Sequence, residues 1–496
     1  MSSQAVVSGR PDATGASGAS GASGASGRYR WRWPAAFVLI VGALMDMIDV
    51  TIVNVTLPTI RHDLGASATA LEWVVSGYML AFAAALIIAG NLGDLLGRKR
   101  MFLFGAGLFG VASLCAGLSA TAPELIAARV VQGAAAAAMA PQVLATFRAI
   151  FSGAERGKAF GIYGAMLGFA SAIGLVLGGL LTEANVFGWT WRSVFFVNIP
   201  IAAVTLIAGL RVVPETRDPA PRRPDVPAAL LLAGSLVAIV YPLLEGRQLG
   251  WPAWVWVLAA AGVAGLCALG VLEGRRRRRP VAPLLRRGLF RVPAFSAGLS
   301  IQLAFAAGMQ GFFLLFALWL QAGEGFSPLK AGLTAVAFSV GSFFTAPVAV
   351  PLAQRYGRVV LASGAAAMVA GIAGVAVAAS HVGVGGSPWP IVPGLVVAGA
   401  GLALLVVPLV NVVLAAVPAA VAGGASGLFS TAQQLGGAVG VALLGTVFFG
   451  YLNDGHSFEA AIVHTAPYAI GAFALCAILS LLLPRTAVSD EAHTES

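Results

Sequence analysis

The sequence predicts an all-α membrane protein with fourteen transmembrane helices, and three observations support this prediction. Hydrophobic residues make up 58% of the 496-residue chain, and charged residues only 10%. A soluble domain carries about 25% charged residues, so a water-soluble fold is excluded. The apolar residues form runs of roughly 20 residues, the length that crosses a bilayer as a helix. The Lys and Arg residues lie mostly in short segments between these runs.

The apolar runs and their polar breaks give the expected helix positions. They are 35–57, 70–91, 101–120, 123–146, 158–182, 192–213, 226–244, 253–273, 294–320, 328–353, 358–379, 390–417, 424–450 and 464–484. Fourteen crossings place both termini on one side of the membrane. Most of the 30 Lys and Arg residues fall on that side, so both termini are expected to be cytoplasmic, in a multi-pass protein of the cell membrane. The net charge of +10 therefore indicates orientation and not binding to nucleic acid.

Two similar segments indicate an internal repeat. Residues 90–98 and 350–358 each follow the second helix of a six-helix series. Duplicated halves of this kind are typical of transporters. The expected organisation is a disordered cytoplasmic tail at 1–34, a six-helix half at 35–213, a linker with two additional helices at 214–293, a second six-helix half at 294–484 and a cytoplasmic tail at 485–496. The long polar leader also indicates that the first helix is a retained anchor and not a signal peptide.

Two carboxylates lie near the middle of the first apolar run, Leu39 to Pro58. A carboxylate there costs about 2.5 to 3.5 kcal/mol on insertion scales. Asp46 and Asp49 are three residues apart, so they share one helical face, which we expect to point into a polar cavity. The alternative is that the two carboxylates only make polar contacts between packed helices. Acidic residues inside a membrane most often serve an ion or substrate, and we therefore favour a functional site.

Arg129 is a basic residue well inside a predicted helix, and such a charge normally requires a partner. It could pair with Asp46 or Asp49, or polarise Gln132. The alternative is that its side chain reaches back to the membrane surface, because Pro123 begins the helix only six residues earlier.

The segment Gly90-Asn-Leu-Gly-Asp-Leu-Leu-Gly-Arg-Lys-Arg100 closely resembles the loop signature G-x-L-a-D-r-x-G-r-k-r of the major facilitator superfamily. In that family this loop latches the two halves in one conformation. The resemblance implies a conformational latch formed by Gly90, Gly93, Asp94, Gly97 and Arg98. A merely basic cytoplasmic loop would explain the three cationic residues but not the spacing of the glycines and the acid.

Three further segments narrow the resemblance. Residues 44–58 resemble the helix 1 signature L-D-x-T-I-V-N-V-A-L-P, which places the signature acid at Asp49. Residues 129–133 resemble the family element R-x-x-Q-G, and residues 191–200 resemble W-R-x-x-F-x-I-N-V-P. Together with the fourteen expected helices, these segments make the chain similar to the fourteen-helix drug:proton antiporter branch of the superfamily. This implies export of a small, largely apolar drug or antibiotic in exchange for protons, with Asp49, Asp46 and Arg129 as the proton-coupling residues and no cofactor beyond the proton motive force.

One segment departs from that branch. The helix 5 element usually reads G-P-x-x-G-G, but here Leu175 stands in place of the proline. The remaining glycines of this helix still allow another helix to approach closely; the expected gating and packing positions are Gly168, Gly174, Gly178 and Gly179. The missing proline favours an alternative function, either a proton-independent facilitator or a transporter-like sensor.

Amide side chains in apolar runs are the expected substrate contacts, because a few polar groups in an apolar cavity suit a mainly apolar molecule. They are Gln132, Gln302, Gln310, Asn411 and Gln434. The expected partners are a small-molecule substrate, protons and the lipid bilayer, with no nucleic acid, and the chain is expected to be a monomer. The five histidines do not cluster with acids at metal spacing, so neither a metal site nor an enzyme is predicted.

Overall fold

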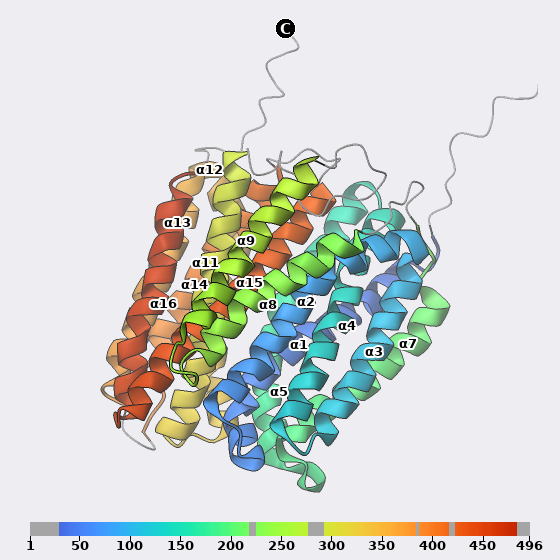
Figure 1. The fold of residues 1–496 in the computed structure, drawn as a ribbon. Coiled ribbons are helices and arrows are strands. Elements are labelled where there is room, and N and C mark those ends of the chain that lie inside the picture. Colours follow the sequence, from blue (N-terminus) through green and yellow to red (C-terminus); the bar gives the residue numbers. More distant parts are fainter. Residues whose placement is uncertain (1–28, 218–224, 276–291, 383–385, 416–421, 484–496) are drawn as a thin grey trace, which may run out of the picture.

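The computed structural model describes residues 29–217, 225–275, 292–382, 386–415 and 422–483. Within these ranges the chain is helical with short turns and contains no β-strand, as the sequence predicts (Figure 1). The helices of the first half are α1 (Arg32–Leu64), α2 (Ala68–Leu96), α3 (Arg98–Leu118), α4 (Ala122–Ile150), α5 (Gly153–Ala184), the short α6 (Ser193–Phe196) and α7 (Asn198–Val212). Two 3₁₀ turns, Val186–Gly188 and Thr190–Arg192, connect α5 to α6.

The remaining helices follow the expected order. They are α8 (Val226–Glu245), α9 (Ala253–Arg275), α11 (Pro293–Leu318) with a π-helical turn (Trp319–Gly323), α12 (Pro328–Tyr356), α13 (Arg358–Ala379), α14 (Val392–Ala415), α15 (Ala422–Asn453) and α16 (Phe458–Ser480). The expected tails, 1–34 and 485–496, lie almost wholly outside the described residues.

The number of membrane-length helices differs slightly from the expected fourteen. Thirteen helices in the described part of the chain are long and apolar enough to cross a membrane. The expected fourteenth is α5, which has 32 residues, but its described apolar segment is the shorter stretch Ile173–Ala184. The predicted helix order is therefore confirmed, and the count of fourteen is not reproduced.

Some helices begin before the predicted apolar runs, with a polar side chain capping the first turn. The hydroxyl of Ser67 accepts a hydrogen bond from the Ala70 amide at 3.1 Å at the start of α2. The hydroxyl of Ser457 accepts a hydrogen bond from the Ala460 amide at 3.1 Å at the start of α16. This helix begins at Phe458, six residues before the predicted position 464. Such N-caps satisfy amides that the helix itself leaves free.

The two repeated segments form equivalent turns. Gly97 ends α2 and begins α3 with φ 116°, and Gly357 ends α12 and begins α13 with φ 59°. Residues with a side chain rarely adopt these φ values, so glycine is needed in both turns. The duplicated sequence thus corresponds to a duplicated structural feature.

The two halves meet along two seams. Helix α2 packs against α15 along the first seam, and α5 packs against α12 along the second. The inserted pair attaches through α8, which contacts both α2 and α15. We call the end of the bundle where α1 begins and α16 ends the terminal end, and the other end the distal end (Figure 1).

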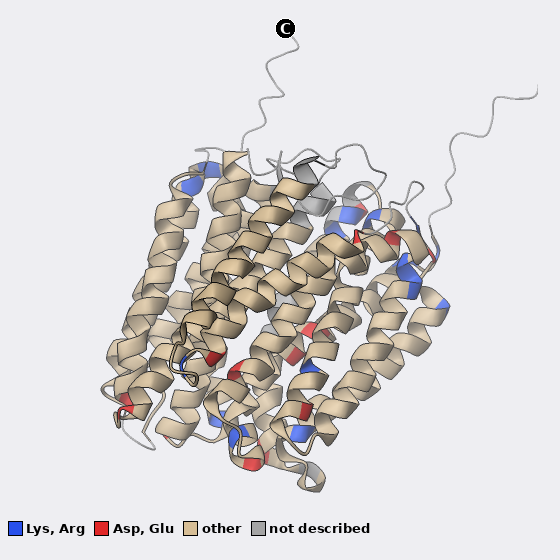
Figure 2. Ribbon diagram, viewed as in Figure 1, with Lys and Arg blue, Asp and Glu red and all other residues tan. Residues whose placement is uncertain are grey.

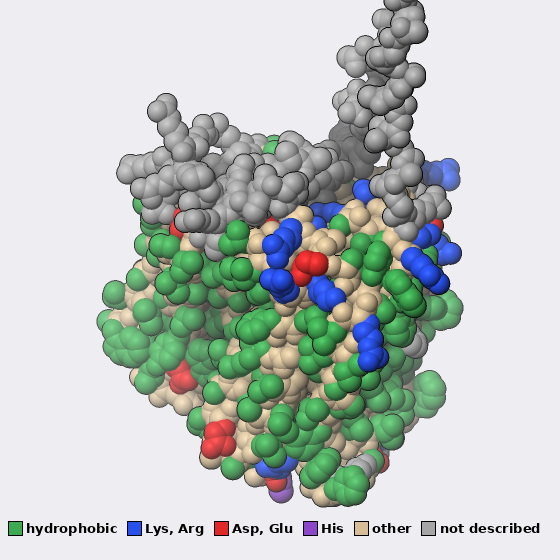
Figure 3. Space-filling view, turned by 90° about the vertical axis from the view of Figure 1, so that its right-hand side faces the viewer, with side chains coloured by type: hydrophobic (Ala, Val, Ile, Leu, Met, Phe, Trp, Pro, Cys, Tyr) green, Lys and Arg blue, Asp and Glu red, His purple; other side chains and the backbone are tan. Residues whose placement is uncertain are grey.

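Charged and apolar residues are distributed as in a membrane protein. Lys and Arg gather toward the terminal end (Figure 2), and hydrophobic side chains cover much of the flank below them (Figure 3). Elsewhere on the outer surface, Phe343, Phe344, Leu230 and Trp256 are large apolar side chains that are between 57% and 74% exposed. An apolar surface of this extent requires lipid contact, so the chain is a multi-pass membrane protein.

Candidate functional site

A buried ion pair joins α1 and α4. The Asp49 side chain is fully buried, and Arg129 is only 2% exposed. Nη1 of Arg129 donates a hydrogen bond to Oδ2 of Asp49. The alternative in which Arg129 reaches the membrane surface is therefore wrong. A buried charge is tolerated when an opposite charge and hydrogen bonds compensate it, and this pair meets that condition.

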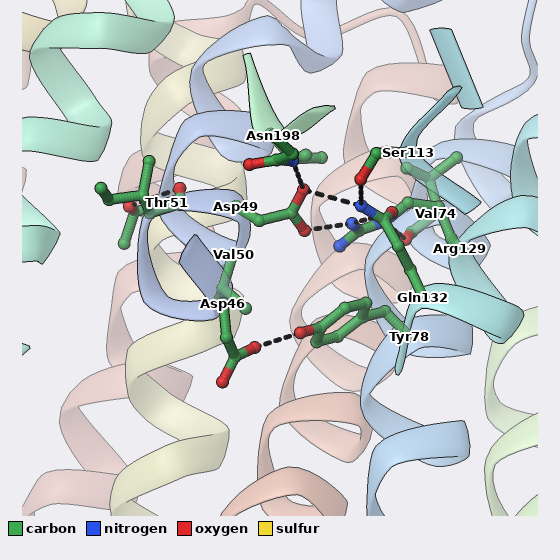
Figure 4. A network of polar contacts seen from close by, with 12 residues as sticks. Asp46, Asp49, Val50, Thr51, Val74, Tyr78, Ser113, Arg129, Gln132 and Asn198 are labelled. Atoms are coloured by element: carbon green, nitrogen blue, oxygen red, sulfur yellow. Dashed lines mark hydrogen bonds and ion pairs between the residues drawn. The ribbon is translucent and has the colours of Figure 1, made fainter. Parts of the chain in front are cut away.

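Gln132 and Asn198 complete the contacts of Asp49. Nε2 of Gln132 lies 3.0 Å from Oδ1 of Asp49 and 2.7 Å from Oγ of Ser113. Oε1 of Gln132 accepts a hydrogen bond from Arg129 at 2.8 Å, so Gln132 is held on both sides. Nδ2 of Asn198 donates to Oδ1 of Asp49 at 2.9 Å. Three side chains therefore donate to one carboxylate (Figure 4).

The local sequence places Asn198 in this network. It is the first residue of α7, after the short helix α6 and the 3₁₀ turn that contains the buried Trp191. Nε1 of Trp191 donates to Asp63 at 2.7 Å and anchors the turn to the distal end of α1. The segment 191–200 therefore fixes where α7 begins, and Asn198 faces Asp49.

Asp46 lies one turn earlier in α1 and has a different partner. It is half-buried and accepts a hydrogen bond from the Tyr78 hydroxyl. The guanidinium carbon of Arg129 lies 4.3 Å from the centroid of the Tyr78 ring, within the range of a cation–π interaction. Tyr78 thus lies between Asp46 and Arg129, and the two acids point to separate partners (Figure 4).

Sequence reasoning missed three members of this network, Tyr78, Ser113 and Asn198. Each is a polar residue in an apolar run, which is a signal that could have selected them. Asn198 also lies in the segment 191–200 that carries part of the family resemblance. Contacts between α1, α2, α3, α4 and α7 bring these residues together, and one sequence without its homologues does not reveal such contacts.

The expected latch is an ordered turn inside the first half. Nε and Nη2 of Arg98 donate to Oδ1 of Asp94 at 3.0 and 2.8 Å, and Nη1 lies 3.4 Å from the Ala145 carbonyl oxygen in α4. A side chain at Gly93 would collide with Gln142, and one at Gly90 would contact Pro141. The described side-chain contacts of this segment connect α2, α3 and α4 with α7 and with Glu215 after it, and none reaches the second half.

The glycines of α5 face two different helices. Gly174 and Gly178 lie against α1, and a Cβ at Gly178 would be 2.9 Å from the Ile52 carbonyl oxygen. Gly179 lies against α12, and a Cβ there would be 2.6 Å from the Pro328 carbonyl oxygen. The surroundings of Gly168 lie outside the described residues. Helix α5 continues through Leu175 without interruption.

The amides of the second half lie on three helices. Gln302 is buried in α11, and Gln310 is half-buried in the same helix beside Gly437. Asn411 is exposed on α14 and donates to the Val407 carbonyl oxygen at 3.2 Å, and Gln434 is half-buried on α15. No described contact joins these residues to Asp49.

A small cavity lies between the halves. Its lining comes from α1, α5, α11, the π-helical turn and α12. The lining includes Asn54, Leu175, Phe313, Phe316, Gln321 and Ala335. The cavity therefore combines aromatic and aliphatic surface with two amide groups.

Comparisons with known proteins agree with this architecture. The sequence matches the profile of the Major Facilitator Superfamily over residues 39–441 and 303–496. It is 39% identical to a probable actinorhodin transporter of Streptomyces coelicolor, over 86% of this chain and 74% of that protein. It is 34% identical to the puromycin resistance protein pur8 of Streptomyces alboniger, over 94% of each chain.

The fold is also similar to a solved transporter structure. The crystal structure of a D-xylose-proton symporter superimposes with a TM-score of 0.65 at 15% identity, covering 92% of this chain and 98% of that one. At this identity the similarity concerns the fold alone. The sequence match covers both halves, and its relatives are transporters and not enzymes. This chain therefore belongs to the Major Facilitator Superfamily.

Proposed function

We propose that the protein exports a small, largely apolar drug or antibiotic across the cell membrane in exchange for protons. The observation that carries the proposal is the buried pair of Asp49 and Arg129 inside a transporter bundle. An ionised pair at this depth is costly to bury and marks an ion pathway in many membrane proteins. The names of relatives support the drug class, since they include an actinorhodin transporter and a puromycin resistance protein.

The distribution of charge supports the orientation. Lys and Arg are concentrated at the terminal end (Figure 2), and cytoplasmic loops of membrane proteins carry such an excess. We therefore place both termini in the cytoplasm and the distal end at the extracellular surface. The transporter acts as a monomer and uses the proton gradient in place of a cofactor.

With this orientation, the structure corresponds to a conformation closed toward the outside. Nε2 of Gln321, after α11, donates to the Val55 carbonyl oxygen of α1 at 2.6 Å. The Leu329 amide at the start of α12 donates to Glu183 of α5 at 3.2 Å. Both contacts join the two halves at the distal end, and the latch turn at the terminal end contacts only its own half.

The network suggests how a proton controls this conformation. Asp46 is half-buried, so it is the more accessible of the two acids. Its partner Tyr78 also contacts Arg129, so a proton that arrives at Asp46 disturbs the position of Arg129. A proton on Asp49 in turn removes the charge that holds Arg129. Release of Arg129 then permits α1 and α4 to rearrange, while substrate loading follows loss of the proton to the cytoplasm.

The substrate site is proposed to lie between the halves. The cavity beside Asn54 and Gln321 has the mainly apolar lining with few polar groups that drug-binding sites have. The cavity is small, as expected near a closed end. Gln302, Gln310, Asn411 and Gln434 supply further polar contacts as the halves move.

A drug-susceptibility panel of an expressing strain tests this function. The wild-type chain should raise resistance to at least one apolar antibiotic, and Asp49→Asn should remove that resistance. Asp454→Asn is the control, because this acid is exposed just after the end of α15 and should leave export intact. Normal resistance with Asp49→Asn would contradict the role of Asp49.

A proton-independent facilitator is the second candidate, and the uninterrupted helix α5 favours it. The two functions differ in their energy source. A proton uncoupler should stop drug efflux from preloaded vesicles if the exporter proposal is right. Efflux that continues at the same rate would favour the facilitator.

A further inference from the structure

A buried acid outside the Asp49 network lies at the seam between the halves. Glu72 is in the second turn of α2 and is fully buried. Neither of its carboxylate oxygens has a hydrogen-bond partner among the residues that the structure describes. Burial of an ionised carboxylate without donors is strongly unfavourable, so such a group binds a proton or moves.

The site is shaped to receive this side chain. One carboxylate oxygen of Glu72 occupies the position where a side chain on Gly445 of α15 would begin. Any larger residue at 445 would displace the carboxyl group or separate α2 from α15. The carboxyl group therefore lies inside the seam, in contact with the second half of the molecule.

The end of helix α8 covers the seam beside Glu72 from outside the two halves. Glu245 at its end accepts a hydrogen bond from Trp73 of α2 at 2.8 Å, and Gln248 donates to Thr69 of α2 at 2.6 Å. On the other side, the Leu243 carbonyl oxygen accepts from Thr446 of α15 at 3.2 Å. The end of α8 thus bridges the first seam directly over Glu72.

The charged groups that act on Glu72 also come from this end of α8. They are Arg247, whose positive charge favours the carboxylate, and Glu245, whose negative charge opposes it. Arg247 is only half-buried. It is directed to α15, where Nη1 lies 3.4 Å from the Gly445 carbonyl oxygen and the guanidinium carbon lies 5.4 Å from the centroid of the Phe449 ring. The observed arrangement therefore suits a neutral Glu72.

We propose that Glu72 is a second proton-binding site, which takes protons from the extracellular side and controls the separation of α2 from α15 beneath α8. A proton on Glu72 allows the seam to close over the neutral carboxyl group. Loss of that proton leaves a charge with no donor in the closed seam, and the seam opens to admit water. The inserted helix pair supplies the bridge and the charges that act on this site.

This inference deepens the proposed proton-driven export and rests on its membrane orientation. Its test, however, uses no drug, so failure of the drug assays and failure of this proposal are distinguishable. The probe is the proton itself, and the protein is the full chain reconstituted in lipid nanodiscs.

The first measurement is the infrared difference spectrum between acidic and alkaline buffer. The carbonyl stretch of a protonated carboxylic acid should appear in the wild type at acidic pH and lose one component in Glu72→Gln. Glu245→Gln, which removes the neighbouring acid, should retain that component. A Glu72→Gln spectrum identical to the wild type would overturn the proposal.

The second measurement is the distance across the distal end. Spin labels on His62→Cys and Asp454→Cys, both exposed positions, report the separation of the halves once the exposed Cys115 and Cys267 are replaced. In the wild type, a rise in pH should increase the population of the longer distance. The Glu72→Gln protein should keep the shorter distance at every pH. Glu72→Met is a second variant in case Glu72→Gln folds poorly, because its neutral side chain has no polar atoms that need partners. It should also keep the shorter distance at every pH. A pH response that persists in these variants would overturn the proposal.

Discussion

Two buried carboxylates of the first half, Asp49 and Glu72, have opposite environments. Asp49 accepts hydrogen bonds from Arg129, Gln132 and Asn198, whereas Glu72 has no donor among the described residues. Both side chains are fully buried. Burial alone therefore does not determine how a carboxylate behaves. The donors supplied by neighbouring helices decide whether the charge is compensated or has to be neutralised by a proton.

A third buried acid, in the second half, is an intermediate case. Glu324 follows the π-helical turn at the distal end and is 3% exposed. It accepts one hydrogen bond, from Nε1 of Trp319 at 2.8 Å, while its second oxygen has no partner among the described residues. Asp49, Glu324 and Glu72 therefore form a series in which three, one and no described side chains donate to the carboxylate. Variants along this series should lose stability according to the donors that they remove.

The largest effect is expected for Arg129→Gln. Loss of one partner of a buried ion pair leaves an uncompensated charge, which typically costs about 3 to 5 kcal/mol of stability. Thermal unfolding in detergent should show a strongly lowered midpoint, and export should be lost. The double variant Arg129→Gln with Asp49→Asn should recover part of the stability, because it removes both charges. A double variant no more stable than the single one would contradict the compensation argument.

A smaller loss is expected for Asn198→Ala. This change removes one of the three donors to Asp49, and a hydrogen bond to a charged group contributes about 1.5 to 3 kcal/mol. Arg129 and Gln132 remain in place, so the chain should still fold and export more slowly. The thermal midpoint and the efflux rate check this, with Asn453→Ala, at an exposed position at the end of α15, as the control.

Gly445→Ala tests the environment of Glu72. The added methyl group would occupy the position of a Glu72 oxygen, and overpacking of this kind costs about 1 to 3 kcal/mol. The thermal midpoint should fall, whereas Gly471→Ala, in open space on α16, should change it little. If Glu72 causes the clash, Gly445→Ala should be better tolerated in the Glu72→Ala background. Equal losses in both backgrounds would indicate a clash with something else.

The smallest effect is expected at Glu324, outside the membrane-spanning segment. Burial raises the pKa of this carboxyl above its usual value, and the charge of Glu459 adds to this, while the Trp319 hydrogen bond opposes it. A folded-state pKa above the unfolded value means that the folded state holds more protons. Its stability contribution therefore falls as pH rises from the ordinary glutamate range through the raised pKa. Glu324→Gln should remove this pH dependence from the thermal midpoint, and an unchanged pH profile would argue against it.

The prediction of individual sites from the sequence was less complete than that of the helices. The rarity of charges in apolar runs predicted that Asp49 and Arg129 need partners, and it left open whether Arg129 pairs with Asp46 or Asp49. The two acids were expected to face a polar cavity, but Asp49 is fully buried against Arg129. Gln132 was expected both among the substrate contacts and as a partner of Arg129, and the structure holds it between Arg129 and Ser113. Glu72, which is fully buried near the start of α2, was not among the residues selected from the sequence.

The sequence by itself determined which segments form membrane helices, their order, the duplicated turns at Gly97 and Gly357, and the presence of charges that need partners. These properties depend on hydrophobicity, chain length and backbone conformation, which neighbouring residues in the sequence control. Only the tertiary structure decided which donors meet Asp49 and which helices enclose Glu72. Those contacts join residues that are between 80 and 373 positions apart, so they depend on how whole helices pack and not on any local pattern.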